Sequence, residues 1–286
     1  MQGKIAIITG GNAGIGKQTA IGLAEKGYTI VLFCRNEQKG KIAQEEIQLQ
    51  TGNPNIDVIT CDLSSLENVE QAANKFKQKY DRLDLLINNA GLFYDYLTQT
   101  GDGFETQFQV NHLSHFYLTQ LLLDVLKKSA PARIVNVSSA AHLGKKIDFE
   151  HLPYGKEKYD GLDVYGQTKL ANILFTKELT RRLRQEGIIA FALHPGVVRT
   201  QIGRKNTKGW INWGWKALIS LPIFSISEKK GAETSLYAAT SLELEKFGGE
   251  YLKNNMIVKS SKPSYNQNTA KKLWELSEKL LKEKGR

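Results

Sequence analysis

The sequence has few cysteines and no long apolar run. Its two cysteines, Cys34 and Cys61, lack the spacing of metal ligands or of a disulfide framework. No stretch approaches the roughly 20 apolar residues that a membrane-spanning helix needs. The N-terminus enters the apolar run 5–8 directly, without a basic leader or a cleavage site. We therefore expect reduced thiols, no metal site, no transmembrane segment and a cytoplasmic location.

Linkers, repeats and low-complexity tracts are also lacking. The composition, 41% hydrophobic and 24% charged, is typical of a globular protein. Because α/β folds of 200–300 residues often form one unit, we expect residues 1–286 to be a single domain.

Acidic residues are fewer than basic ones, 29 against 39, which gives a net charge of +10. This excess suits an anionic ligand or surface. The basic residues are scattered, however, with no zinc finger, basic arm or RNA-binding aromatic motif beside them. We expect no nucleic-acid partner.

Apolar, β-rich runs alternate with helical stretches along the chain. Strands are expected at 4–8, 29–34, 57–61, 83–88, 133–138 and 189–193, with a further one at 250–253. Helices are expected at 15–26, 37–50, 65–79, 104–127, around 165, and at 266–283. Continuous apolar strands between helices predict an α/β fold with a doubly wound parallel sheet, the Rossmann fold. Ligands of such sheets bind at the carboxyl ends of the strands.

The first strand ends in the glycine-rich stretch 9–16, TGGNAGIG. Glycines permit a tight turn and a close backbone approach, and the helix that follows presents free N–H groups to a pyrophosphate. A loop of this kind between a strand and a helix favours a dinucleotide. The candidate residues are Gly10, Asn12, Gly14, Ile15 and Gly16.

The second strand ends in Arg35 and Asn36, where a site that prefers NAD would usually have Asp or Glu. A guanidinium at this position can pair with a ribose 2′-phosphate, and Lys39 adds charge one turn later. The alternative is a solvated arginine at a strand end. We predict NADP(H) as the cofactor.

Two further strand ends carry polar or small residues. Asp62, followed by Leu63, is placed to accept a hydrogen bond from the adenine amino group, or is simply a turn residue before a helix. Asn88, Asn89, Ala90 and Gly91 follow the fourth strand with groups suited to lie under a ribose. All of these candidates fall at one edge of the predicted sheet.

Tyr165 and Lys169 are four residues apart in a helical pattern, so they lie on one face, about a turn apart. A tyrosine and a lysine at this spacing, without other motifs, are usually a surface tyrosine and a solvated lysine. Beside a nucleotide site, a lysine ammonium would favour the phenolate, lower the pKa of Tyr165 and make it an acid-base group.

Together these motifs resemble the short-chain dehydrogenase/reductase family over almost the whole chain. Six features occur in the family's order and spacing: TGGNAGIG, NNAG, the helix with Asn111, the strand end VSS, YGQTK and HPGVV. CRN, HPGVVRT and LANILFTKEL resemble the retinol dehydrogenase-like branch, whose members prefer NADP(H) and often carry an N-terminal membrane segment.

The resemblance implies catalytic roles for Asn111, Ser139, Tyr165 and Lys169. Ser139 would hold the substrate carbonyl, Tyr165 would exchange the proton, Lys169 would bind the nicotinamide ribose, and Asn111 would support a water. The same resemblance places the segment after the sixth strand beside the nicotinamide, through Pro195, Gly196, Val198 and Thr200.

Two features stay open. Residues 202–227 carry Trp210, Trp213 and Trp215 among apolar residues, and fit a lid over an apolar substrate, a partner interface, or a peripheral membrane contact. Of the histidines, His112 and His115 are expected to be packing or surface residues, while His142 is a candidate for the wall of the substrate pocket.

The sequence predicts an NADP(H)-dependent oxidoreductase that interconverts a carbonyl and an alcohol on a small apolar substrate. The alternative is a nucleotide-binding regulatory or scaffold protein with little turnover. A monomer and a homo-oligomer are both compatible with the sequence.

Overall fold

A computed structural model describes residues 3–198 and 226–286, and the strands in these ranges form one sheet. The order is β3-β2-β1-β4-β5-β6-β7-β8. Strands β1 to β7 run parallel, whereas β8 pairs antiparallel with β7. The bounds are β1 (Ile5–Thr9), β2 (Thr29–Cys34), β3 (Ile56–Thr60), β4 (Leu85–Asn88), β5 (Ala132–Val137), β6 (Ile188–His194), β7 (Tyr251–Lys253) and β8 (Met256–Val258).

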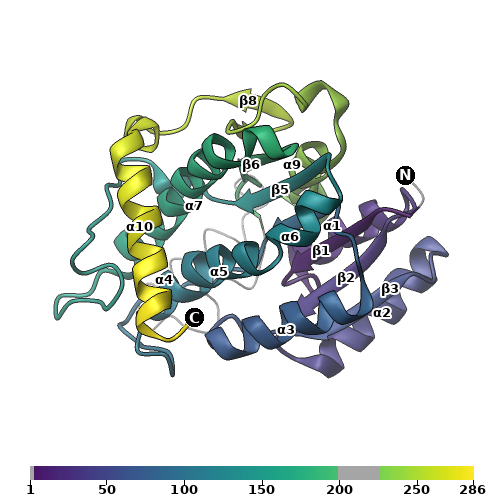
Figure 1. The fold of residues 1–286 in the computed structure, drawn as a ribbon, viewed down its shortest axis with the longest axis horizontal. Helices are drawn as coiled ribbons and strands as arrows, with labels where there is room; N and C mark the ends of the chain where they lie inside the picture. The colour runs from purple at the N-terminus through teal and green to yellow at the C-terminus, as the bar shows by residue number, and fades with distance from the viewer. Residues whose placement is uncertain (1–2, 199–225) are drawn as a thin grey trace.

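Helices cover both faces of this sheet (Figure 1). Helices α1, α2 and α9 pack on one face, and α3, α5 and α7 pack on the other. The bounds are α1 (Gly14–Ala24), α2 (Glu37–Thr51), α3 (Leu66–Lys79), α4 (Thr106–Phe108), α5 (Ser114–Leu121), α6 (Leu123–Lys128), α7 (Gly161–Leu183), α9 (Glu228–Thr240) and α10 (Gln267–Glu283). The predicted single-domain, doubly wound parallel fold is confirmed.

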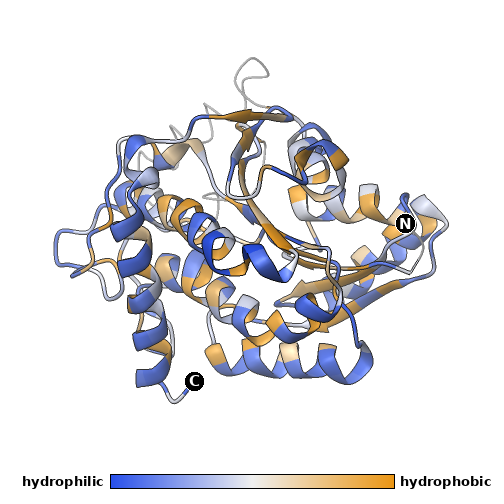
Figure 2. Ribbon diagram, turned by 45° about the horizontal axis from the view of Figure 1, so that its top comes forward, coloured by the Kyte–Doolittle hydropathy of each residue, from blue (hydrophilic) through white to orange (hydrophobic). Residues whose placement is uncertain are grey.

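The central strands are apolar on both sides because both sides are covered. All five residues of β1 are buried, as are five of the six in β2. Figure 2 shows the consequence, with orange strands inside and helices that turn blue faces outward. Since burial on two faces removes the alternation that marks an exposed strand, continuous apolar runs were the right signal.

The predicted helix at 104–127 is wrong as a single element. The segment contains α4, a π-helix at Gln109–Leu113, α5 and α6 in succession. The π-helix widens the backbone at Asn111, whose side chain bonds the main chain of Leu92 instead of facing solvent. π-Bulges inside helices often occur at functional sites, and this one lies beside the candidate site.

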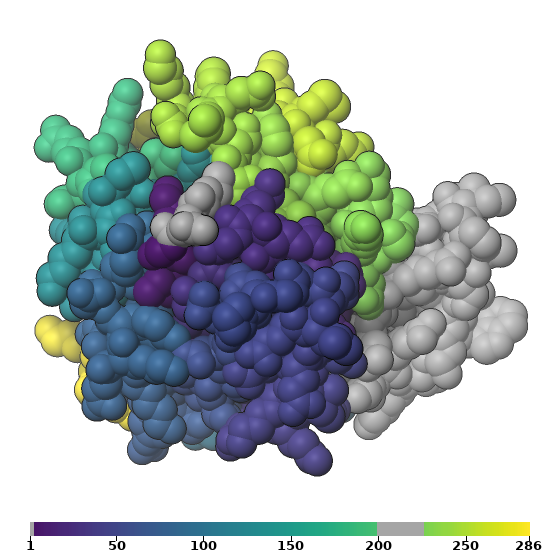
Figure 3. Space-filling model, turned by 90° about the vertical axis from the view of Figure 1, so that its right-hand side faces the viewer, coloured from purple at the N-terminus to yellow at the C-terminus, as the bar shows by residue number. Residues whose placement is uncertain are grey.

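Helix α9 and strand β8 were not predicted. The buried face of α9 consists mainly of small residues, so no wide apolar stripe marks it. Small residues suit the close packing of α9 on α1, where a Cβ added at Gly22 would lie 2.5 Å from Leu236 Cδ1. Figure 3 shows the lime-coloured region of α9 directly beside the purple N-terminal region. The residues of β8 are largely exposed at the sheet edge.

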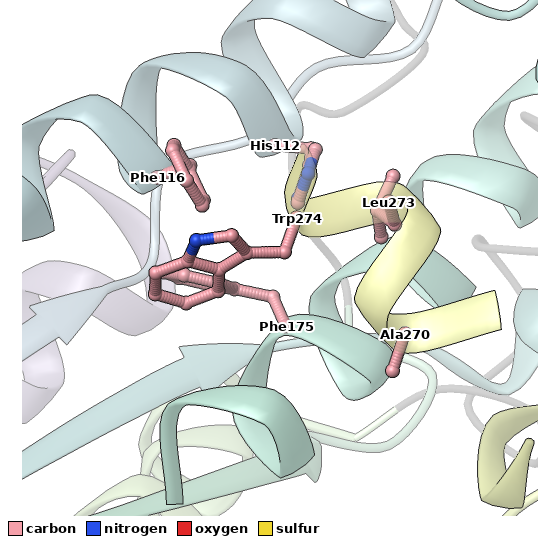
Figure 4. A pocket seen from close by; sticks show the side chains of 6 residues that line it. All are labelled: His112, Phe116, Phe175, Ala270, Leu273 and Trp274. Carbon is pink, nitrogen blue, oxygen red and sulfur yellow. The ribbon is translucent and has the colours of Figure 1, made fainter. Parts of the chain in front are cut away.

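Helix α10 lies outside α7 and extends the layer that contains α5 and α7 (Figure 1). Trp274, only 5% exposed, places its ring 4.8 Å from that of Phe116 and 5.9 Å from that of Phe175. Figure 4 shows the six side chains that meet here: His112, Phe116, Phe175, Ala270, Leu273 and Trp274. Within the described ranges, no helix combines the length and the apolar character needed to cross a bilayer.

Candidate active site

The site lies where the strand order reverses, between β1 and its neighbour β4. Thr9, the last residue of β1, joins the two strand ends. Its hydroxyl oxygen accepts hydrogen bonds from the backbone N–H groups of Asn89 (2.9 Å) and Ala90 (3.0 Å). The Asn89 amide in turn donates to the Thr9 carbonyl at 2.9 Å. The glycine-rich loop and the NNAG segment are therefore held as one wall, to which Asn89 contributes its main-chain N–H and its side-chain amide, and Ala90 its main-chain N–H.

The glycine-rich loop has the shape of a phosphate cradle. Gly10 and Gly14 adopt φ of +65° and +57°, and a Cβ at Gly16 would lie 2.4 Å from the Gly10 carbonyl oxygen. Ala13, the N-cap of α1, makes no side-chain cap bond, whereas the N-caps of α2, α3, α7, α9 and α10 all do. The first turn of α1 thus offers N–H groups and a positive helix end to an anion. These residues, with Asn12 half-buried beside them, fit a dinucleotide pyrophosphate.

The residues predicted to read the adenosine half occupy the ends of β2 and β3. Arg35 is exposed, one residue after β2. Asn36 caps α2, because its Oδ1 accepts from the Lys39 N–H at 2.9 Å. Asp62 Oδ1 accepts from the N–H and hydroxyl of Ser64, at 2.9 and 2.7 Å. The turn role anticipated as the alternative for Asp62 is thus present, and Asn36 has a structural task that the sequence prediction omitted.

Leu63, also predicted to contact the cofactor, is 7% exposed and packs in the core. Its carbonyl accepts a hydrogen bond from the Ser114 hydroxyl at 2.6 Å, which ties the end of β3 to α5. Its side chain therefore faces the protein interior, and only its main chain is available to a ligand.

Asn111 connects three parts of the site. Its Oδ1 accepts from the Leu92 N–H at 2.8 Å, and its Nδ2 donates to the Leu92 carbonyl at 3.0 Å and to Thr168 Oγ1 at 3.1 Å. A Cβ at Gly91 would lie 3.2 Å from Lys169 Nζ and 3.3 Å from Asn111 Oδ1. The NNAG segment, the π-helix and α7 therefore converge on one small volume, and a side chain at Gly91 would be tightly packed there.

Ser139 and Tyr165 form the polar pair of the site. Ser139 is the N-cap of the short 3₁₀ helix Ala140–His142, and its Oγ accepts from the Ala141 N–H at 3.2 Å. The Tyr165 and Ser139 side chains are hydrogen-bonded, which lowers the pKa of Tyr165, but burial outweighs this and raises that pKa to about 12. Phe93 places the edge of its ring on Tyr165, with centroids 5.8 Å apart.

Lys169 is 3% exposed and lies beneath this pair. Its Nζ lies 5.5 Å from the centroid of the Tyr165 ring and donates to the Val137 carbonyl at 3.2 Å. Burial lowers the pKa of the ammonium to about 8. Desolvation of the phenolate therefore dominates the pKa of Tyr165, and the expectation that the Lys169 ammonium favours the phenolate stays a prediction.

The segment after β6 closes the other side. Gly196 adopts φ of +91°, and the Val197 carbonyl accepts from the Ile226 N–H at 2.8 Å. Val198 is buried and packs in one cluster with Ile15 of the glycine-rich loop. Pro195 is half-buried at the start of this segment. These residues thus lie next to the glycine-rich stretch through Val198 and Ile15, and their contact with the nicotinamide stays a prediction.

Some predicted residues lie outside the described ranges. Thr200, Trp210, Trp213 and Trp215 are among them, as is the proposed lid except for its last two residues. Ile226 forms a bridge with Val198, and Ser227 caps α9.

Sequence reasoning missed the residues that support the site rather than touch a ligand. Thr9 and Thr168 belong to recognised motifs, but nothing local predicts that one bonds Asn89 and the other Asn111. His142 is 1% exposed, so it is a buried residue behind Ser139 and not the pocket wall that its position suggested. His112 and His115 are buried in the packing around α5.

The fold and the site define a nucleotide-dependent oxidoreductase of the short-chain dehydrogenase class. The family model described as short chain dehydrogenase matches residues 4–209, so this chain belongs to that family. It is retinol dehydrogenase-like. It is 42% identical over 282 residues to retinol dehydrogenase 13 of Mus musculus, covering 98% of this chain and 84% of the relative. Retinol dehydrogenase 12 of Mus musculus is 44% identical over 279 residues, with 98% and 86% covered.

A solved structure shares the same fold along nearly the whole chain. The crystal structure of an uncharacterised protein from Mycobacterium paratuberculosis superposes with a TM-score of 0.77 at 32% identity. The match covers 98% of this chain and 94% of that one.

Proposed function

We propose that this protein is an NADP(H)-dependent oxidoreductase that interconverts a carbonyl and an alcohol on an apolar substrate. The observation that carries the proposal is the convergence of Ser139, Tyr165 and Lys169 beside the NNAG segment, which itself packs on the glycine-rich loop. A protein that only bound a nucleotide would need the loop but not a hydroxyl pair above a buried lysine. The relatives named retinol dehydrogenases take an apolar alcohol by name, which supports an apolar substrate here.

The side chains divide the work around the substrate oxygen. The bound nicotinamide supplies or accepts the hydride. The Ser139 hydroxyl holds the carbonyl oxygen and stabilises it as charge develops. Tyr165, with its pKa raised to about 12, remains protonated at neutral pH and gives its proton to that oxygen in reduction.

Lys169 and Asn111 support this pair from below. The Lys169 ammonium, near the Tyr165 ring, stabilises negative charge that develops on the phenol oxygen as the proton leaves. It is also placed to bind ribose hydroxyls beside Gly91. Asn111 holds the Leu92 backbone and the start of the NNAG wall in place.

The preference for NADP(H) is supported by charge at the end of β2. Arg35 is exposed there, and the neighbouring Asn36 is occupied as a helix cap. An exposed guanidinium can form two charge-assisted hydrogen bonds to a 2′-phosphate, and the neighbouring carboxylate, Glu37 at the start of α2, is paired with Lys41 at 2.7 Å.

Turnover of NADPH with all-trans-retinal and a panel of aliphatic and aromatic aldehydes tests the proposal. Tyr165→Phe should lower kcat at least about a hundredfold, a typical contribution of a general acid, while leaving NADPH affinity nearly unchanged. Near wild-type turnover in this variant would remove Tyr165 from its role. Tight NADPH binding without turnover of any compound would instead favour a nucleotide-binding regulatory protein.

A further inference from the structure

One peptide group in the site is held on both sides by histidines. The carbonyl oxygen of Ser139 lies 2.6 Å from His142 Nδ1, and the N–H of the same peptide, from Ala140, points to His194 Nδ1 at 3.3 Å. Both imidazoles are buried, His142 at 1% exposure and His194 at 6%. Neither takes part in the chemistry proposed above.

The chemistry of the peptide group fixes the proton on each ring. A carbonyl only accepts, so His142 Nδ1 must carry a hydrogen and Nε2 must be the acceptor. That acceptor is used, because the Ser261 N–H donates to His142 Nε2 at 3.1 Å. An N–H only donates, so His194 Nδ1 must be the bare nitrogen. The two rings are therefore neutral and of opposite tautomer, and burial, which lowers the pKa of both, keeps them neutral.

Three separate parts of the chain meet behind Ser139 in this way. His142 comes from the 3₁₀ helix that follows Ser139, and His194 ends β6. Ser261 comes from the segment after β8, and the Tyr251 ring of β7 packs against His142 with centroids 5.1 Å apart. The fold thus brings distant elements together around the peptide group between Ser139 and Ala140.

The direction of the Ser139 hydroxyl depends on this peptide group. Ser139 has extended backbone angles, φ −158° and ψ 158°, and its Oγ accepts from the Ala141 N–H. Turning the 139–140 peptide would change ψ of Ser139 and break the hydrogen bond from the Ala141 N–H to Ser139 Oγ. The hydroxyl would then be free to leave the direction in which it meets Tyr165.

We propose that His142 and His194 are positioning residues, which clamp the 139–140 peptide group and so hold the Ser139 hydroxyl toward the substrate oxygen and Tyr165. This rests on the proposed function, in which Ser139 binds that oxygen. Neither histidine contacts the glycine-rich loop through any bond described, so the clamp acts on the chemical step and not on cofactor affinity.

Pairs of substitutions separate the hydrogen bond from the volume of the ring. His194→Asn keeps an acceptor, Oδ1, near the place of Nδ1, whereas His194→Gln moves the amide one carbon further and His194→Leu removes it. His142→Asn keeps a donor near Nδ1, and His142→Leu does not. His151→Asn is the matched control, at a half-exposed histidine whose ring bonds Asp148 and not this peptide.

We expect the Leu and Gln variants to lose at least about tenfold in kcat, since a misplacement of 1 Å can cost about a hundredfold. The two Asn variants should recover most of kcat. Dissociation constants for NADPH should stay at the wild-type value in every variant. If a Leu variant fails to fold, the kcat of His194→Asn compared with that of His194→Gln is sufficient to test the clamp.

Ser139→Ala provides the reference and a second readout. Because the histidines act through Ser139, adding His194→Gln to Ser139→Ala should lower kcat no further. A further fall of the same size as in the wild-type background, or full kcat in His194→Gln, would overturn the clamp. Full kcat in Ser139→Ala would instead overturn the role of Ser139 in the proposed function, so the two failures are distinct.

Discussion

At the scale of single residues, Lys169 shows a conflict between activity and stability. Its ammonium is 3% exposed, and burial lowers its pKa from 10.5 to about 8. Below pH 8 the lysine is charged in both the folded and the unfolded state, so the folded state bears the full cost of the buried charge. As the pH rises from 8 to 10.5 the folded protein loses this proton first, and the cost disappears.

Lys169→Met should therefore stabilise the protein at pH 7 while abolishing activity. The fall of the pKa from 10.5 to about 8 corresponds to at most roughly 3–4 kcal/mol. The Val137 carbonyl keeps a partner after the change, because Asn172 Nδ2 also donates to it at 3.2 Å. Urea unfolding measures the difference in the free energy of unfolding between Lys169→Met and the parent protein. This difference should be large at pH 7 and vanish at pH 10.5. Equal stability at pH 7 would show that the buried ammonium costs little.

Arg35 carries the cofactor preference that we propose. Arg35→Asp should weaken NADPH binding by roughly 1.5–3 kcal/mol, the contribution of one charged hydrogen-bonded pair, and should narrow or reverse the preference over NADH. Calorimetric titration with both cofactors measures this. Arg184→Asp makes the same change of net charge at an exposed site between α7 and β6, and should leave both affinities unaltered. Unchanged NADPH affinity in Arg35→Asp would remove Arg35 from the site.

The residues that touch a ligand were easier to predict than those that hold them. Tyr165 and Lys169 share one helix, so their relation follows from a spacing of four. The bond between Thr9 and Asn89 joins residues 80 apart, and that between Ala140 and His194 joins residues 54 apart. Such pairs depend on the order of strands in the sheet, which a local pattern does not contain.

At the scale of elements, the start of α7 determines where Tyr165 lies. Asp160 caps the helix by accepting from the N–H groups of Leu162 and Asp163, at 3.0 and 3.1 Å. The next residue, Gly161, is buried against the loop after NNAG. A Cβ at this position would lie 2.1 Å from the Tyr94 carbonyl oxygen. The first turn of α7 is therefore in direct contact with that loop.

Gly161→Ala should push these two elements apart. Overpacking of a buried contact costs about 1–3 kcal/mol, and the displaced turn should also lower kcat/KM because Tyr165 follows four residues later. Gly101→Ala is the control, since a Cβ there meets nothing within 4 Å and should be nearly neutral. Urea unfolding of both variants measures the cost. Equal stability would mean that the loop yields without strain.

Elements with a strong apolar pattern were predictable and the others were not. The helix at 65–79 was predicted within a residue of α3, because its apolar residues lie on one face and Ser65 caps it. The π-helix at Gln109–Leu113 was not, since it depends on the bond of Asn111 to Leu92. Helix α9 packs through small side chains, which carry no helical stripe.

At the scale of the whole molecule, four of the five histidines are buried, and burial lowers the pKa of each. The pKa falls to about 4 for His112, to about 3 for His115 and to about 4 for His194, and it is also lowered for His142. Unfolding exposes these rings and returns their pKa toward 6.5. Between pH 6.5 and 4 the unfolded state therefore binds protons that the folded state does not, and the free energy of unfolding decreases as the pH is lowered. Glu105, whose pKa burial raises, opposes this by at most one proton.

The protein should accordingly be sensitive to mild acid. Three such groups together lower the free energy of unfolding by about 4 kcal/mol per pH unit once the pH is well below 6.5. A domain in the lower part of the ordinary stability range, about 5–9 kcal/mol, should then unfold between roughly pH 5.5 and 4. Urea midpoints measured from pH 7.5 to 5 give the slope. His112→Leu fills its apolar surroundings with an uncharged side chain and leaves Ser277 bonded to the Leu273 carbonyl at 2.9 Å, so the slope should drop by about a quarter to a third. An unchanged slope in His112→Leu would mean that this histidine is not neutral in the fold, and a flat profile in the parent would contradict the burial of all four.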